Sequence, residues 1–207
     1  MEAERVQLDA TSWVDVVRDF LPDADQVYED LLSSVEWRPS RVYRYERYVD
    51  EPRMGGWLPR DRPNAALVAA REQIVERYGV PFDGGALALY RNERDSVGFH
   101  RDRELKWLED TRIGVLSLGA TRPWLMKPMG PGPALRDNED LTGSIDLMPA
   151  GGDLLVMGGR CQSAWLHAVP KVAGACGPRI SVQWRWTSRR GRPDMNPGYY
   201  EARKFSR

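Results

Sequence analysis

The chain has 207 residues, of which 42% are hydrophobic and 29% charged, values typical of a soluble globular protein with one sizeable core. Its net charge is zero, which excludes a globally basic nucleic-acid-binding protein. No apolar run approaches the length of a membrane span, and residues 1–13 lack a signal pattern, so we expect a cytoplasmic protein that binds no membrane. Two cysteines, Cys161 and Cys176, are too few for a disulfide framework and are expected to be reduced.

Two helices are predicted in the N-terminal part of the chain. Asp23 is a candidate cap for the first, because apolar residues then recur with a 3.6-residue period. These residues are Val27, Tyr28, Leu31 and Val35. The second and clearer helix is Ala65–Tyr78, with Asn64 as its cap and Gly79 as its stop. Around these helices, residues 12–17 predict an edge strand, residues 41–49 a strand or ribbon, and the proline-containing residues 51–64 an extended loop.

After Gly79 the pattern changes to short strands separated by turn signals. The candidate strands are 86–90, 113–118, 123–127, 144–148, 153–157, 165–169 and 179–186. Regularly spaced short strands predict a sandwich or barrel with the helices packed outside, and a double-sheet jelly roll would bring strand ends together at a mouth. We therefore expect a mostly β, α+β fold in one domain, 1–207. Residues 1–85 would form the helices and a lid region, 86–190 the core and 191–207 a basic tail.

Basic residues are unevenly distributed although the net charge is zero. Arginines are interleaved with tyrosine and tryptophan between residues 36 and 62, and basic residues outnumber acids in residues 179–207. Such mixtures can hold phosphates and stack bases. A solvated, arginine-rich surface explains the pattern about equally well.

The stretch LALYRNERDSVGFHRD, residues 87–102, ends in His100-Arg101-Asp102, and His167 is the only other histidine in the chain. Two histidines and one carboxylate can occupy one face of a metal ion and leave the opposite face open, which suits non-haem Fe(II) and oxygen chemistry. An H-x-D pattern also occurs by chance in many chains, and a lone histidine is more often a satisfied core or surface residue.

Residues 179–186 predict a strand with one apolar and one polar face, because side chains alternate in a strand. The apolar face holds Ile180, Val182, Trp184 and Trp186; the polar face holds Arg179, Ser181, Gln183 and Arg185. The polar face either meets solvent or lines a barrel mouth. In a mouth, an arginine is suited to a carboxylate because its planar fork grips both oxygens.

Three blocks of the sequence resemble a known family. They are LALYRNERDSVGFHRD, GDLLVMGGRCQSAWLHAVPK and GPRISVQWR. In this order and spacing they are similar to the core blocks of the AlkB-type Fe(II)/2-oxoglutarate-dependent dioxygenases, which reverse alkylation damage on nucleic-acid bases. The resemblance covers roughly residues 50–186, with EPRMGGW similar to the substrate-lid region.

The resemblance implies a site for Fe(II), 2-oxoglutarate and O2. His100, Asp102 and His167 match the iron ligands, and Arg179 matches the residue that pairs with the distal carboxylate of 2-oxoglutarate. These four are the expected catalytic residues. The residues expected to bind the co-substrate are Tyr90, Arg179 and Arg185.

This chain departs from the family pattern at three positions. Ala88 stands where members often have asparagine, and R-x-N-x-T-x-R reads R-I-S-V-Q-W-R, with Ser181 and Gln183 replacing asparagine and threonine. Some hydrogen bonds to 2-oxoglutarate are therefore in question, while the charged anchors remain.

The implied reaction is oxidative dealkylation of bases such as 1-methyladenine and 3-methylcytosine, a direct repair of alkylated DNA. The base must leave the duplex or start unpaired, and aromatic residues must hold it. Trp57 and Tyr45 are the candidates for stacking, and Arg53 for orientation or phosphate contact; packing of a lid explains them about equally well. We expect a monomer whose partner is alkylated nucleic acid, single-stranded DNA in the first place and RNA as the alternative.

Two other functions fit the sequence. One is an enzyme on the same scaffold that acts on RNA, a protein side chain or a small metabolite. The other is a non-catalytic module that binds metal or nucleic acid, in which the histidines are structural. Binding of 2-oxoglutarate and its turnover distinguish the second from any dioxygenase.

Overall fold

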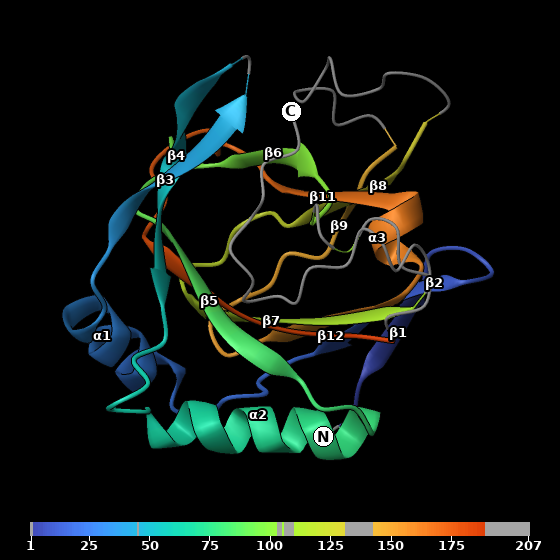
Figure 1. The fold of residues 1–207 in the computed structure, drawn as a ribbon, viewed down its shortest axis with the longest axis horizontal. Helices are drawn as coiled ribbons and strands as arrows, with labels where there is room; N and C mark the ends of the chain where they lie inside the picture. The colour runs from blue at the N-terminus through green and yellow to red at the C-terminus, as the bar shows by residue number, and fades with distance from the viewer. Residues whose placement is uncertain (1, 45, 103–104, 106–109, 131–142, 189–207) are drawn as a thin grey trace.

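The protein is described by a computed structural model that covers residues 2–44, 46–102, 105, 110–130 and 143–188. Within this part, two antiparallel sheets face each other (Figure 1). The larger has the order β1-β2-β10-β7-β12-β5-β4-β3 and the smaller the order β6-β11-β8-β9. The mostly β, α+β jelly-roll fold expected from the sequence is thereby confirmed.

The elements of the larger sheet are β1 (Glu4–Gln7), β2 (Ser12–Val17), β3 (Arg38–Arg44), β4 (Arg47–Trp57), β5 (Asp83–Tyr90), β7 (Thr111–Gly119), β10 (Leu154–Gly159) and β12 (Arg179–Thr187). Those of the smaller sheet are β6 (Val97–His100), β8 (Leu125–Pro128), β9 (Ile145–Asp146) and β11 (Trp165–Val169). The helices are α1 (Ala24–Ser34), α2 (Ala65–Tyr78) and the short α3 (Cys161–Ala164).

Strand alternation divides the apolar side chains of the larger sheet between two cores. On β12, Ile180, Val182 and Trp184 point outward into a core shared with α1 and α2. On β5, Ala88 and Tyr90 point the other way, into a core between the two sheets. The polar face of β12 therefore turns toward the space between the sheets. Of the two alternatives for this face, solvent or the mouth of a barrel, this position fits the mouth.

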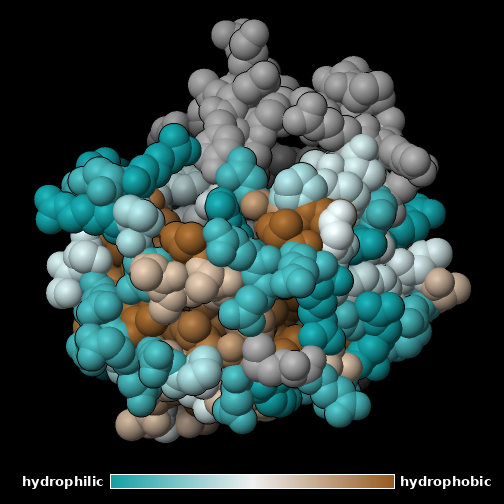
Figure 2. All heavy atoms as spheres, turned by 90° about the horizontal axis from the view of Figure 1, so that it is seen from below, coloured by the Kyte–Doolittle hydropathy of each residue, from teal (hydrophilic) through white to brown (hydrophobic). Residues whose placement is uncertain are grey.

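Both predicted helices form on the outer face of the larger sheet (Figure 1). The Asn64 side chain accepts a hydrogen bond of 3.2 Å from the Leu67 amide at the start of α2. Gly79 ends this helix with φ of 64°, a left-handed conformation that glycine adopts without strain. Asp23 precedes α1 without a side-chain capping bond. The face seen from the side of α2 carries polar residues around patches of apolar surface (Figure 2).

Several strand expectations need correction. Residues 12–17 form β2 as predicted, but β2 lies between β1 and β10 and is not an edge strand. Residues 51–57, expected in a loop, belong to β4. Proline is tolerated there because Pro52 lies opposite the irregularity between Pro39 and Arg41 of β3, and β4 pairs with β5 only from Met54 onward. The sequence also did not predict β1, β6 or α3.

Across the described residues, no helix has both the length and the apolar character required to cross a membrane. Cys161 and Cys176 are both free thiols. The tail 191–207 lies outside the described residues.

Candidate metal centre

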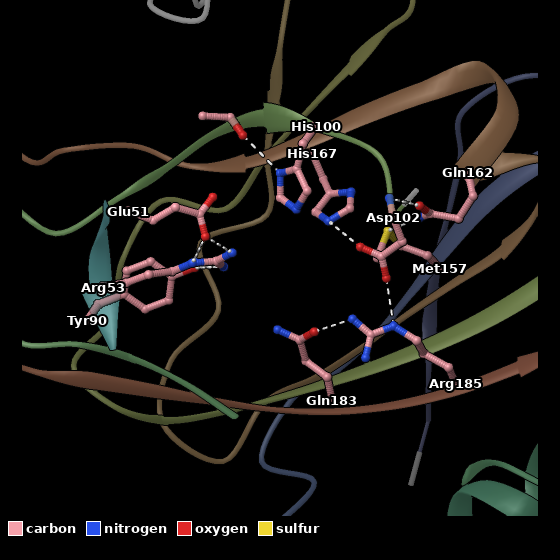
Figure 3. Close-up of polar contacts among 11 residues, drawn as sticks. Glu51, Arg53, Tyr90, His100, Asp102, Met157, Gln162, His167, Gln183 and Arg185 are labelled. Atoms are coloured by element: carbon pink, nitrogen blue, oxygen red, sulfur yellow. Dashed lines mark hydrogen bonds and ion pairs between the residues drawn. The ribbon is translucent and has the colours of Figure 1, made fainter. Parts of the chain in front are cut away.

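Pairing of β6 with β11 brings the two histidines of the chain together. His100 ends β6, and its register partner on β11 is His167, so their ring centroids are 4.2 Å apart. Asp102 follows two residues after His100. The candidate ligand atoms of the three side chains all lie within 4.8 Å of one another, and their side chains converge in Figure 3.

Two contacts hold Asp102 in position. Its backbone amide donates to Oε1 of Gln162 at 2.9 Å, and its Oδ2 accepts from Nε of Arg185 at 2.6 Å. Burial alone would raise the pKa of Asp102, but the charge and the hydrogen bond of Arg185 act in the opposite direction, and the pKa lies below its usual range. The carboxylate is therefore ionised, as a metal ligand must be.

Both imidazoles are kept neutral. Burial lowers the pKa of His100, and burial together with nearby positive charge lowers the pKa of His167 to about 3. Nδ1 of His100 lies 2.9 Å from the Gly98 carbonyl oxygen. The tautomer that donates this bond leaves the Nε2 lone pair free for a metal. The His167 ring stacks on Trp124 with 5.5 Å between centroids, which fixes its plane.

This donor set fits Fe(II). Two neutral imidazole nitrogens and one ionised carboxylate could hold one ion on a single face and leave the opposite face open. Nδ1 of His167 is buried and has no hydrogen-bond partner among the described residues, whereas its Nε2 faces Asp102 at 4.0 Å. The arrangement thus presents lone pairs to a common point.

Arg179 indicates that the site also binds an anion. Its side chain is completely buried, and it donates from Nη2 to the Ser117 hydroxyl at 2.8 Å. Nε and Nη1 have no hydrogen-bond partner within the described residues. Leaving buried charged donors unpaired is unfavourable by more than about 1–3 kcal/mol each. A carboxylate of a small ligand such as 2-oxoglutarate could pair with Nη1 or with Nε, and its second oxygen with Nη2, since the parallel donor pairs of a guanidinium are Nη1/Nη2 and Nε/Nη2.

Tyr90, which the resemblance gives as a co-substrate-binding residue, lies beside Arg179. The two are register partners on β5 and β12, and the Arg179 guanidinium carbon is 5.8 Å from the centre of the Tyr90 ring. The Tyr90 hydroxyl faces Nη1 of Arg53 at 3.5 Å. Ala88 and Ser181, two positions that depart from the family pattern, are register partners of each other. Each lies two residues along its strand from the Tyr90 and Arg179 pair, and therefore on the same face of the sheet.

Arg185 lies against the metal ligands. Besides its bond to Asp102, it donates from Nη2 to Oε1 of Gln183 at 2.6 Å. The expectation that Arg185 binds the co-substrate stays a prediction; its contact with Asp102 fixes that carboxylate and lowers its pKa. Gln162, the other residue that holds Asp102, was not predicted as a site residue. No local pattern around Gln162 indicates this role, because the contact joins residues 60 positions apart.

Arg53 is largely buried rather than displayed to solvent. It forms an ion pair of 2.8 Å with Glu51, and the two side chains are 18% and 12% exposed. Both face the space bounded by the histidines (Figure 3). Glu51 was missed because residues 51–57 were expected in a loop; in a strand, its spacing of two from Arg53 places both on one face.

The stacking candidates are less defined by the structure. Trp57 ends β4 and is 58% exposed, opposite Ala86, which is itself opposite Gln183. It therefore lies in the same row of the sheet as Gln183 and also lines a groove of about 430 Å³ beside α2. Tyr45 lies outside the described residues.

Comparisons with known proteins agree on one family. A sequence profile of the 2OG-Fe(II) oxygenase superfamily matches residues 18–190. The alpha-ketoglutarate-dependent dioxygenase alkB homolog 3 of Bos taurus is 32% identical over 180 residues, which cover 80% of this chain and 62% of that protein. The DNA oxidative demethylase ALKBH2 of Homo sapiens is 22% identical, over 79% of this chain and 68% of that protein. The chain thus spans less than two thirds of the length of the bovine relative.

The fold is shared more widely than the sequence. A prolyl hydroxylase from Trichoplax adhaerens, solved with a hypoxia inducible factor peptide fragment, superposes with a TM-score of 0.58 at 13% identity. The match covers 84% of this chain and 83% of that one. A fold of this kind does not by itself determine the substrate.

Proposed function

Because the chain belongs to the 2OG-Fe(II) oxygenase superfamily, we propose that it is a 2-oxoglutarate-dependent dioxygenase that removes N-alkyl groups from bases in nucleic acid. The proposed lesions are of the 1-methyladenine and 3-methylcytosine type, and the proposed role is direct repair of alkylation damage. The observation that carries the oxygenase part is the His100, Asp102 and His167 cluster combined with the two buried, unpaired nitrogens of Arg179. The nucleic-acid part is supported by the similarity to alkB homolog 3 and ALKBH2.

The three ligands would hold iron, which when bound couples decarboxylation of 2-oxoglutarate with O2 to oxidation of the N-alkyl group. Asp102 supplies a negative oxygen, and the neutral His100 and His167 supply nitrogen lone pairs. Arg185 keeps Asp102 ionised and fixes its Oδ2, so that Oδ1 remains directed at the histidines. A hydroxylated N-methyl group then collapses to formaldehyde and the unmodified base.

Arg179 and Tyr90 would orient the co-substrate. One of the two unpaired nitrogens of Arg179 can pair with the distal carboxylate, and Tyr90 offers a hydroxyl near it. Arg179 is completely buried next to the apolar core between the sheets, and the low polarity there strengthens an ion pair.

For the substrate base, we propose Trp57 and Tyr45 as stacking surfaces and Arg53 as an orienting group. Trp57 is supported by its exposure and by its place in the row of the sheet that contains Gln183. Arg53 is held by Glu51 next to Tyr90. Single-stranded DNA is the proposed partner, because its bases need no extrusion.

One assay tests both parts of the proposal. Purified protein is incubated with Fe(II), ascorbate, 2-oxoglutarate and single-stranded DNA or RNA oligonucleotides that carry 1-methyladenine or 3-methylcytosine. We expect succinate, formaldehyde and repaired base. Asp102→Ala should abolish all three, whereas Asp25→Ala, an exposed carboxylate on α1, should leave them unchanged.

The outcomes separate the two parts. Decarboxylation without base repair would keep the oxygenase assignment and overturn the substrate. Failure to bind 2-oxoglutarate would overturn both and favour the non-catalytic binding module.

A further inference from the structure

The carboxylate of Glu51 lies at the edge of the proposed reaction space with one oxygen used and the other free. Oε2 accepts three hydrogen bonds: from Nη2 of Arg53 at 2.8 Å, from Nε of Arg53 at 3.2 Å and from the Ser40 hydroxyl at 2.8 Å. Oε1 accepts none from any side chain or amide in the described ranges. A carboxylate can accept about four hydrogen bonds on its two oxygens, so Oε1 is available to accept a hydrogen bond from a ligand.

The position of Glu51 is fixed by its strand. Glu51 lies on β4 before the pairing with β5 begins at Met54. The carbonyl of the adjoining Pro52 accepts a hydrogen bond of 2.7 Å from the amide of Ser96, the residue that precedes β6. This link holds Glu51 next to the strand that carries His100. In Figure 3 the Glu51 carboxylate extends from the side of Arg53 toward the histidines. The side chain is 12% exposed, so its orientation is restricted.

Glu51 is also ionised. Burial would raise the pKa of Glu51, but Arg53 and Ser40 outweigh it and hold the pKa below its usual range. An ionised carboxylate accepts hydrogen bonds and cannot donate them. A group that approaches Oε1 must therefore bring a donor.

We propose that Glu51 is a specificity-determining residue whose Oε1 accepts a hydrogen bond from the exocyclic amino group of the substrate base. The inference rests on the proposed function. 1-Methyladenine and 3-methylcytosine carry an amino group beside the alkylated nitrogen. At the corresponding carbon, C6 of 1-methylguanine and C4 of 3-methylthymine, the other two lesions carry a carbonyl oxygen and are called oxo-bearing here; the C2 amino group of 1-methylguanine lies on the opposite side of its alkylated nitrogen. The carboxylate stabilises the first pair and repels the second, because two acceptors face each other and neither can be satisfied.

The test compares Glu51→Gln with wild type on four single-stranded oligonucleotides, each with one of these lesions. Glutamine keeps the volume and can still accept from Arg53, but its amide can rotate to offer a donor. We expect the ratio of kcat/KM for amino-bearing over oxo-bearing lesions to fall by about 10- to 100-fold. This ratio is taken within one preparation, so partial misfolding of a variant cancels. Glu29→Gln, the same change at an exposed position of α1, should leave the ratio unchanged.

A binding measurement without turnover provides the second readout. Fluorescence anisotropy of the same oligonucleotides, without iron, should show the amino-over-oxo preference of wild type reduced in Glu51→Gln. A merely structural role, in which Glu51 only holds Arg53, predicts that kcat/KM and affinity fall equally for all four lesions, and this result overturns the inference while wild-type repair still stands. Absence of repair by wild type on every lesion overturns the proposed function and the inference with it.

Discussion

Arg185 and Asp102 are 83 residues apart in the chain, yet Nε of the arginine donates a hydrogen bond of 2.6 Å to Oδ2 of the aspartate. Both side chains are 13% exposed, so the ion pair is shielded from solvent. It joins the polar face of β12 to the segment that follows β6. The larger sheet thereby sets the orientation and charge of a candidate ligand that follows a strand of the smaller sheet.

Replacement of Arg185 by methionine should weaken metal binding. The substitution keeps most of the volume but removes the charge that keeps Asp102 ionised and the donor that orients it. Loss of such a supporting contact lowers metal affinity by about 10- to 100-fold. Calorimetric titration of the purified apoprotein with Mn(II) measures the change. Arg94→Met, at a side chain that is 86% exposed, is the control; equal affinities for all three proteins would contradict the assigned role.

Replacement of Arg179 by methionine should separate stability from co-substrate binding. The apoprotein should keep its thermal unfolding midpoint or gain slightly, because two buried, unpaired nitrogens disappear. Wild type should gain about 2.7 kcal/mol of stability when 2-oxoglutarate is present at about 100 times its Kd. At the same concentration the variant should gain almost nothing. A preserved ligand-induced shift in the variant would place the carboxylate elsewhere.

Replacement of Trp57 by alanine should weaken binding of single-stranded oligonucleotides. A base stacked on an aromatic side chain contributes about 1–3 kcal/mol, so affinity should fall by roughly 5- to 150-fold. The fold should tolerate the change to within about 0.5 kcal/mol because the side chain is 58% exposed. Leu32→Ala, at another exposed apolar residue on α1, serves as the comparison. If both variants bind equally well, Trp57 belongs to surface packing alone.

Asp95 should contribute stability that is lost in acid. Burial would raise the pKa of Asp95, but hydrogen bonds from Arg91 and the charges of Arg91 and Arg122 lower it. A folded-state pKa below the unfolded value of about 3.9 stabilises the protein above that pH, and the contribution disappears as pH falls through the folded-state pKa. Asp95→Asn should therefore be less stable than wild type by roughly 1–3 kcal/mol at pH 7.

The stability difference between the same two proteins should begin to shrink below about pH 4 and should close as pH falls through the lower folded-state pKa of Asp95, where the wild-type carboxyl is protonated as well. Urea unfolding at pH 7, 5 and 3 measures the difference. A gap that stays constant over this range would mean that Asp95 acts through its shape and not through its charge.

Periodicity in the sequence predicted the elements whose apolar residues all face one way. Ala65–Tyr78 was predicted with its cap and stop because capping and left-handed glycine are local effects. The strand beginning at Arg179 was predicted with its faces assigned because alternation is a local property as well. Residues 51–57 were assigned to a loop because they contain a proline. Proline disrupts a strand only where its missing amide would have paired, and that depends on the neighbouring strand, which the sequence does not show.

The sequence by itself determined which residues could form the site: two histidines, one H-x-D pair and two arginines six residues apart, in blocks similar to one family. Only the tertiary structure decided what surrounds them. Strand register and contacts between the sheets determine three features of the site. They are the pairing of His100 with His167, the hydrogen bond from Arg185 to Asp102 and the position of Glu51. Residue types and local periodicity are encoded within a few positions of the chain, whereas register and sheet packing follow from burying both faces of a strand at once, which requires partners from distant segments.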